Sequence, residues 1–179
     1  MSERTTLLNG SAIHRVLTRI AHEIAERNDD SQVVVLVGVQ RGGVHLAERL
    51  GSMLNGIWTQ AVPVGKLDVN MHRDDLHKHA APNVHPTIIP FDITDKTVVL
   101  VDDVLFSGRT ARAALDALND FGRARRVQLA VLIDRGHREL PIKADFVGKN
   151  VPTAMSERID VRLKEGGGED GVYLEKEPL

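Results

Sequence analysis

Apolar residues recur with two different periods along the chain. Between residues 11 and 27 they return every three or four positions, which is the period of an amphipathic helix. Ser11 stands where an N-cap is expected, because its hydroxyl can accept a hydrogen bond from a free backbone N–H group. The opposite side of this helix carries a polar stripe, which on spacing alone is a solvated face; its members are Arg15, Thr18, Arg19 and His22.

Continuous apolar runs predict the strands. Residues 33–37 are all valine or leucine, which is typical of a strand that is buried on both faces of a parallel sheet. Residues 98–101 and 127–133 form two further runs of this kind. Weaker strand patterns cover residues 61–69, 146–147, 159–163 and 172–174.

Helical patterns separate these strands at residues 44–54 and 109–121, and Gly122 follows the second helix in the position of a C-terminal cap. Residues 70–90 differ, because they hold four His and three Pro with little periodicity. A stretch of that length within a compact domain is usually a functional loop or an excursion such as a hairpin. The alternation of strands and helices predicts an open α/β sheet that is mostly parallel.

Composition narrows the class of protein. The 179 residues suit one domain over residues 1–179, and the absence of Cys fits a reducing compartment. The net charge of −2 excludes a globally basic nucleic-acid coat, and 3% aromatic residues argue against a stacking platform for single strands. No signal-type segment opens the chain, and the longest apolar stretch, residues 33–39, is too short to span a bilayer. We therefore expect a cytoplasmic protein with no membrane partner.

The most informative segment surrounds an acidic pair. Asp102 and Asp103 end an apolar run, and a loop with Ser107, Gly108 and Thr110 leads into the next helix. Backbone N–H groups at a helix N-terminus suit a phosphate, whereas carboxylates suit sugar hydroxyls or a phosphate-bound Mg²⁺. A phosphorylated sugar fits both halves of this arrangement.

A second loop with glycine and arginine follows the first strand at residues 39–43, and it has the composition of another anion site. The acidic strand resembles a Walker B strand, but the chain has no Gly-x-x-x-x-Gly-Lys-Ser/Thr motif (Walker A). This absence excludes a nucleoside triphosphatase of that class. The four His of residues 70–90 lack the spacing of a metal site, so we predict no metal ligands from the protein; these are His72, His77, His79 and His85.

Residues 98–110 resemble the phosphoribosyl-pyrophosphate (PRPP) signature of type I phosphoribosyltransferases. Four further blocks resemble the PyrR family, which comprises pyrimidine-operon attenuation proteins that are also uracil phosphoribosyltransferases. The resemblance extends from about Leu7 to Val172, and the four blocks are residues 62–69, 73–76, 89–93 and 134–153.

This resemblance implies a type I phosphoribosyltransferase fold: an open, mostly parallel sheet flanked by helices, a flexible loop at about 70–90 over the site, and a small C-terminal hood at about 145–175. It also implies an enzyme that converts uracil and PRPP to UMP and pyrophosphate, with Mg²⁺ arriving on PRPP. The implied catalytic residues are Asp102, Asp103 and Arg73. The implied PRPP-binding residues are Val101, Asp102, Asp103, Leu105, Phe106, Ser107, Gly108, Arg109 and Thr110.

The leaving pyrophosphate would lie on a loop formed by Gln40, Arg41 and Gly42. The family usually has Thr-Arg-Gly in this loop, whereas this chain has Arg41-Gly42-Gly43, with the arginine one residue early. Such a loop resembles that of purine phosphoribosyltransferases and leaves two alternatives: a regulator with little catalytic activity, or a purine phosphoribosyltransferase. Purine enzymes commonly have an acid where Phe106 stands, which argues against a purine base.

The resemblance places the base against a hood with Asp134, Lys149, Val151 and Met155. Asp134 either accepts a hydrogen bond from N3–H of uracil or pairs structurally with Arg135 or Arg138. The resemblance also implies binding of pyr leader mRNA, favoured by UMP and opposed by PRPP, and a homodimer or larger homo-oligomer. The implied RNA contacts are Thr18, Arg19, His22, His137, Arg138, Lys143 and Lys149.

Overall fold

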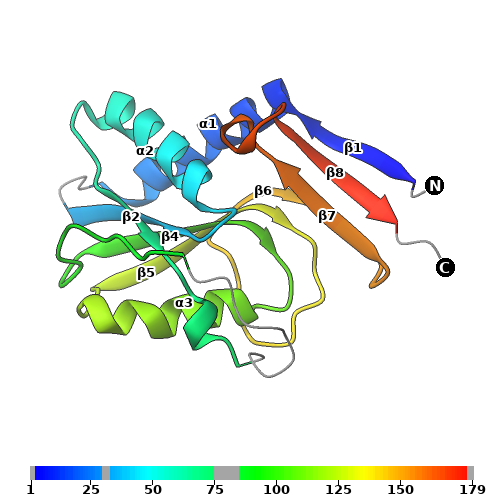
Figure 1. The fold of residues 1–179 in the computed structure, drawn as a ribbon. Coiled ribbons are helices and arrows are strands. Elements are labelled where there is room, and N and C mark those ends of the chain that lie inside the picture. Colours follow the sequence, from blue (N-terminus) through cyan, green and yellow to red (C-terminus); the bar gives the residue numbers. More distant parts are fainter. Residues whose placement is uncertain (1–2, 30–32, 75–84, 177–179) are drawn as a thin grey trace.

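The structure is a computed structural model that describes residues 3–29, 33–74 and 85–176. Its centre is a five-stranded sheet in the order β3-β2-β4-β5-β6, in which every neighbouring pair is parallel (Figure 1). Parallel pairing aligns the carboxyl ends of all these strands along one edge of the sheet. The strands are β2 (Val34–Val39), β3 (Val64–Leu67), β4 (Thr97–Leu105), β5 (Arg126–Asp134) and β6 (Phe146–Asn150).

Helices cover both faces of this sheet. Helices α1 (Gly10–Arg27) and α2 (Val44–Trp58) lie on one face, and α3 (Arg109–Leu118) lies on the other (Figure 1). Successive strand residues point to opposite faces, so Val34 and Leu36 join the core under α1 and α2, whereas Val35 and Val37 join the core beside α3. Within the described residues, no helix is long and apolar enough to cross a membrane.

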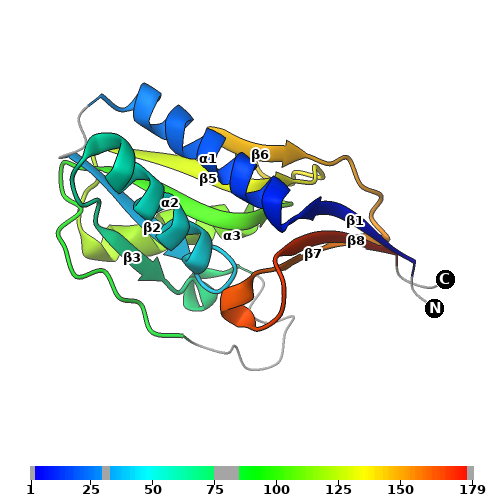
Figure 2. The ribbon, with the colours of Figure 1, turned by 90° about the horizontal axis from the view of Figure 1, so that it is seen from above.

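A second, smaller sheet is built from both ends of the chain. Its order is β1-β8-β7 and its pairs are antiparallel (Figure 2). The strand patterns at 159–163 and 172–174 predict two of its members, whereas the N-terminal strand has no counterpart in the sequence analysis. The short strand predicted at residues 146–147 is confirmed and continues to residue 150 in the main sheet, although the resemblance placed these residues in the hood at about 145–175. The strands are β1 (Arg4–Asn9), β7 (Glu157–Arg162) and β8 (Gly171–Lys176).

Two sequence predictions about element ends are wrong. Asn9, not Ser11, caps α1, since the Asn9 side-chain oxygen accepts a hydrogen bond from Ala12 N at 2.9 Å. The motif strand does not stop before the acidic pair, because β4 continues through Asp102 and Asp103 to Leu105 and pairs with β5 along that length. The carboxylates are therefore held by a sheet ladder rather than by a loop.

The segment after β3 returns to the sheet. Its beginning is the short 3-10 helix η2 (Asn70–His72), and Ile88 then pairs antiparallel with Lys66 of β3. The Asp68 carboxylate accepts hydrogen bonds from Asn70 N at 3.0 Å and from His85 N at 2.6 Å. These two bonds connect the beginning of the segment with its later part. Of the four His in this segment, His77 and His79 lie outside the described residues.

The loop that contains the 3-10 helix η5 (Lys164–Gly166) lies beside α2 (Figure 2), and Arg49 of α2 holds it there. Its guanidinium donates to Glu165 at 2.8 and 2.6 Å and to both carboxylate oxygens of Asp170 at 2.8 Å. These bonds raise the pKa of Arg49 and lower the pKa of both acids. Bidentate, partly buried pairs of this kind hold geometry better than exposed ion pairs do.

The turn from β2 to α2 passes close to β4. A Cβ atom at Gly43 would overlap the carbonyl oxygen of Val101, which belongs to the strand that carries the acidic pair. Glycine at this position therefore sets the separation between the turn and β4.

We expect Gly43→Ala to lower the free energy of unfolding by about 1–3 kcal/mol, because the turn must move away from β4. Gly56→Ala is the matched control, since this glycine lies in α2 with no neighbouring atom within 4 Å of its added Cβ. Gly56→Ala should instead stabilise the protein by about 0.5–1 kcal/mol. Urea denaturation of both variants measures this contrast, and equal effects of the two changes would contradict the assigned close approach.

Candidate active site

Two adjacent carboxylates stand at the carboxyl end of β4. Because they alternate along a strand, they face different cavities. Asp102 lines a cavity together with the loop from Leu105 to Thr110, and Asp103 lines another together with Arg41 and Gly42. One oxygen of each is fixed by a backbone N–H, from Asp103 to Asp102 at 2.9 Å and from Val104 to Asp103 at 2.8 Å.

The pair is electrostatically costly. Burial raises the pKa of the Asp102 carboxyl well above its ordinary value, and the neighbouring Asp103 charge raises it further. The positive charge of Arg73 acts in the opposite direction and lowers the pKa of Asp102. A cation or a set of hydroxyl donors bound beside the two acids would relieve this repulsion, as expected at a binding site.

The loop after β4 is shaped to surround an anion. Gly108 has φ of 91°, a left-handed conformation that favours glycine, and it begins α3 without a side-chain cap. The N–H groups in the first turn of a helix carry partial positive charge. The first turn of α3 contains no acid that would neutralise this charge. Ser107 Oγ accepts a hydrogen bond from Arg109 N at 3.3 Å. This geometry suits a phosphate monoester, and residues 106–110 are called the phosphate loop from here on.

The two arginines near this loop behave differently. Arg73 Nη1 donates to Thr110 Oγ1 at 3.3 Å, which brings this residue from the segment after β3 to the phosphate loop. The guanidinium of Arg109 instead pairs with Asp74 and with Glu139, the latter at 3.0 Å. Arg109 therefore offers its backbone N–H to the loop, while its side chain ties the loop to neighbouring segments.

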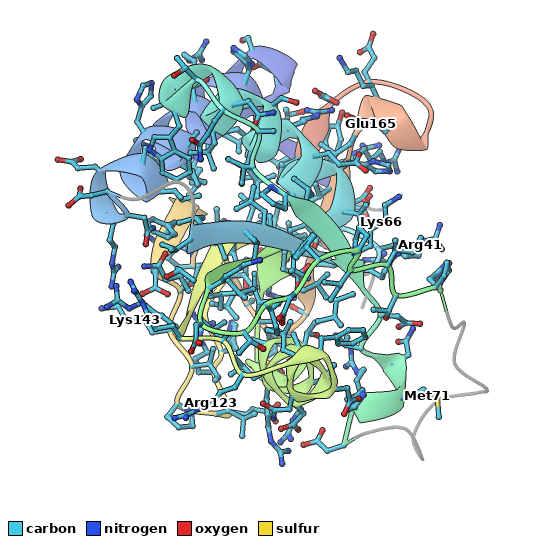
Figure 3. All side chains as sticks on the ribbon, turned by 90° about the vertical axis from the view of Figure 1, so that its left-hand side faces the viewer. Arg41, Lys66, Met71, Arg123, Lys143 and Glu165 are labelled. Atoms are coloured by element: carbon cyan, nitrogen blue, oxygen red, sulfur yellow. The ribbon has the colours of Figure 1, made fainter. Side chains whose placement is uncertain are left out.

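The loop of Gln40, Arg41 and Gly42 reaches the other carboxylate. A Cβ atom at Gly42 would overlap the Asp103 carboxylate, so only glycine permits this contact. The cavity at this point measures about 220 Å³ and is also lined by Leu163 and Gly166 from the smaller sheet and its loop. In Figure 3, Arg41 and Glu165 lie on the same side of the molecule. The cavity therefore has room and positive charge for a second anionic group beside Asp103.

The predicted base-reading acid is engaged with its neighbours. Asp134 Oδ1 accepts a hydrogen bond from Gly136 N at 3.0 Å, and Oδ2 accepts from the Arg138 guanidinium. Of the two alternatives for Asp134, the structural pairing is therefore the one observed. Among the other base candidates, Val151 lies beside the end of β5, because Val151 N donates to Asp134 O at 2.8 Å. Met155 is 67% exposed.

The candidate RNA contacts divide into bound and exposed side chains. Arg19 donates to the carbonyl oxygens of Val147 and Gly148 and pairs with Glu23, and Arg138 donates to Phe106 O at 2.7 Å. Thr18 Oγ1 donates to His14 O, and His137 Nε2 contacts Thr153 O. Arg19 and His137 are nevertheless exposed, as are His22, Lys143 and Lys149, whose side chains form no hydrogen bond or ion pair within the described residues. Lys143 lies on the opposite side of Figure 3 from Arg41.

Comparisons with known proteins decide the family. A family model described as a phosphoribosyl transferase domain matches residues 3–165. A protein of Roseiflexus sp. named Bifunctional protein PyrR is 62% identical over 170 residues, which cover 94% of this chain and 93% of that protein. A protein of the same name from Thermus thermophilus is 54% identical over 175 residues, 97% of each chain. The chain belongs to the PyrR family.

Solved structures bear out the fold of this PyrR family member. A hypoxanthine phosphoribosyltransferase of Trypanosoma cruzi superposes with a TM-score of 0.71 at 16% identity over 97% of both chains. A hypoxanthine-guanine phosphoribosyltransferase of Bacillus anthracis gives 0.68 at 18% identity, covering 83% of this chain and 84% of the other. At such identities the likeness concerns the fold alone. The predicted type I phosphoribosyltransferase fold and the resemblance to PyrR are confirmed.

Two residues at the site were not singled out from the sequence. His45 lines the cavity beside Asp103, and its position one turn after Arg41 was the available signal. Arg135 follows the end of β5 and is buried against the phosphate loop and the turn after β6. Its burial depends on contacts between distant segments, which no local pattern indicates.

We expect Asp102→Asn to stabilise the protein at alkaline pH. The raised pKa of folded Asp102 means that the unfolded chain loses this proton first, so wild-type stability falls as pH rises above the ordinary carboxyl value of about 4. Asparagine avoids that loss. Its melting temperature should exceed that of wild type at pH 8, by about 2–4 °C per kcal/mol relieved, and the difference should shrink towards pH 4. The exposed Asp116→Asn serves as control, and a difference that does not change with pH would contradict the assignment.

Proposed function

We propose that this chain is a uracil phosphoribosyltransferase that also binds pyr leader mRNA in a UMP-dependent way and so regulates transcription of pyrimidine biosynthesis genes by attenuation. One observation carries the catalytic part: Asp102 and Asp103 lie between two loops, each suited to one anionic group, at the carboxyl edge of a parallel sheet. Membership of a family whose relatives are named bifunctional supports the second activity. A cytoplasmic location is part of this proposal, because PRPP and mRNA are found there.

In the proposed reaction, each group of the site has a role. The loop from Ser107 to Thr110 binds the 5′-phosphate, and the two carboxylates accept hydrogen bonds from the ribose hydroxyls. As the bond from ribose C1 to pyrophosphate breaks, positive charge develops on the ribose, and uracil N1 bonds to C1 and loses its proton, for which the Asp103 carboxylate is the candidate acceptor. Carboxylates within a few ångströms stabilise that charge in the transition state. Arg41 offers a positive charge to the leaving pyrophosphate.

The chain's donors fit Mg²⁺ that arrives with PRPP. Within residues 3–29, 33–74 and 85–176 there is no group of three or more His, Asp or Glu that would form a closed metal site. Mg²⁺ usually binds through one or two carboxylates together with substrate phosphates, and Asp102 and Asp103 supply that number. When bound, Mg²⁺ neutralises charge on the leaving pyrophosphate.

A regulator with little catalytic activity is the alternative that one observation favours. Arg41 stands one residue earlier than the family pattern, and Gly42 rather than an arginine contacts Asp103. Purine transfer is disfavoured by Phe106, whose ring stands where purine enzymes carry an acid. A homodimer would join two basic faces into one RNA-binding surface, and we include it in the proposal.

The first experiment measures UMP formation from uracil and PRPP with Mg²⁺, with hypoxanthine and guanine as competing bases. We expect uracil to be the preferred base. Asp103→Asn should lower kcat by about 100- to 10,000-fold, the range for a group that acts in proton transfer, and by less if it only positions ribose. Asp116→Asn should leave kcat unchanged. A loss under about threefold in Asp103→Asn would remove both roles.

The second experiment measures retention of a leader RNA hairpin with and without UMP at several salt concentrations. Lys143 is the cleanest test, because its side chain is exposed and it is not a base candidate, whereas Lys149 is one and replacing Arg19 also removes bonds to Val147 and Gly148. Lys143→Ala should reduce the slope of log affinity against log salt by about 0.7. Arg125→Ala, outside the proposed surface, should leave the slope unchanged. Identical slopes for wild type and Lys143→Ala would exclude this phosphate contact.

A further inference from the structure

Arg135 is the one arginine or lysine that is buried among the residues that the structure describes, with 8% of its surface exposed. Its guanidinium meets neutral acceptors. Nε donates to Thr153 Oγ1 at 3.0 Å, and Nη2 donates to Ala154 O at 3.2 Å and Glu157 O at 2.8 Å. Burial lowers the pKa of Arg135, while the charge of Glu157 raises it. A buried charge that is satisfied by three fixed acceptors holds those acceptors in one arrangement.

The same guanidinium packs on the phosphate loop. Its central carbon lies 4.2 Å from the centroid of the Phe106 ring, within the range of a cation–π contact. The rings of Phe106 and His137 also meet in an edge-on arrangement, with centroids 5.9 Å apart and planes inclined by 67°. Arg135 N also donates to Leu105 O at 3.1 Å, so both backbone and side chain of this residue contact the end of β4 or its loop.

Arg135 therefore joins the end of β4 and its loop to the turn of residues 153–157. If the proposed site binds a phosphate at residues 107–110 and a ribose at Asp102 and Asp103, the base would extend past the carboxyl ends of the neighbouring strands β5 and β6. Those strands end at Asp134 and Asn150, and the turn of residues 153–157 follows them. That turn is the segment that Arg135 binds.

We propose that Arg135 is a positioning residue that sets the distance between the phosphate loop and the turn of residues 153–157, and thereby selects ligands that carry a pyrimidine base as well as a phosphate. This inference rests on the proposed function, since it concerns the base of UMP. Lysine cannot replace the arginine, because one ammonium group cannot stack flat on Phe106 and donate to three separate acceptors. Arg135 itself need not touch the ligand.

The test compares two ligands that differ in having a base. Calorimetry measures the affinity of wild type and Arg135→Lys for UMP and for PRPP with Mg²⁺. We expect Arg135→Lys to weaken UMP binding by at least about tenfold, the scale of one lost hydrogen bond to a charged group, with PRPP affinity within about twofold of wild type. Arg158→Lys is the matched control, because this neighbouring arginine is exposed, and it should bind both ligands as wild type does.

Thr153→Val tests the same proposal independently if Arg135→Lys fails to fold. It removes the acceptor of the Arg135 Nε bond and leaves the arginine in place, so we expect a smaller loss of UMP affinity and again none for PRPP. Unchanged UMP affinity in the folded variants would overturn the proposal, as would equal losses for both ligands, which indicate a damaged phosphate loop. Wild-type UMP formation is measured separately, so a failure of the proposed enzyme is distinguishable from a failure of this inference.

Discussion

Two like charges held side by side are the constraint on which the site depends. Asp102 and Asp103 are adjacent on β4, and the strand ladder to β5 prevents the backbone there from relaxing away. Burial and mutual repulsion raise the pKa of Asp102, so the empty site opposes ionisation that bound hydroxyls or a cation would favour. Repulsion between the two acids lowers the stability of the protein without ligand, and we expect a bound ligand to restore it. Such a loss of stability is common at functional sites.

Sheet topology explains why the other groups converge on these acids. Strands β2, β4, β5 and β6 run in parallel, so the loops that follow them all open at one edge. Glycine then permits close approach, at Gly42 against the Asp103 carboxylate and at Gly43 against β4. The ion pairs of Arg49 with Glu165 and Asp170 hold the loop of the smaller sheet beside the cavity that Asp103 lines. The proposed positions of phosphate, ribose and pyrophosphate thus follow from one arrangement of strands.

Local patterns in the sequence were enough to predict the main sheet and the motif. Buried strands such as β2 are continuous apolar runs, and the acids with Gly108 form a compact signature. Long-range contacts were not predictable. The strand β1 pairs with β8 from the far end of the chain, and Arg19 and Asp134, for which the resemblance implied RNA and base contacts, form bonds with Gly148 and Arg138. Arg135 is buried only because β5 and the turn of residues 153–157 meet.

A crystal structure of the complex with UMP would show whether the two acids and the loop after β4 form one nucleotide site. We expect the 5′-phosphate to lie on the N–H groups of residues 107–110 and the ribose hydroxyls to lie on Asp102 and Asp103. A nucleotide whose phosphate lies on another loop, or whose ribose lies away from both carboxylates, would contradict this site.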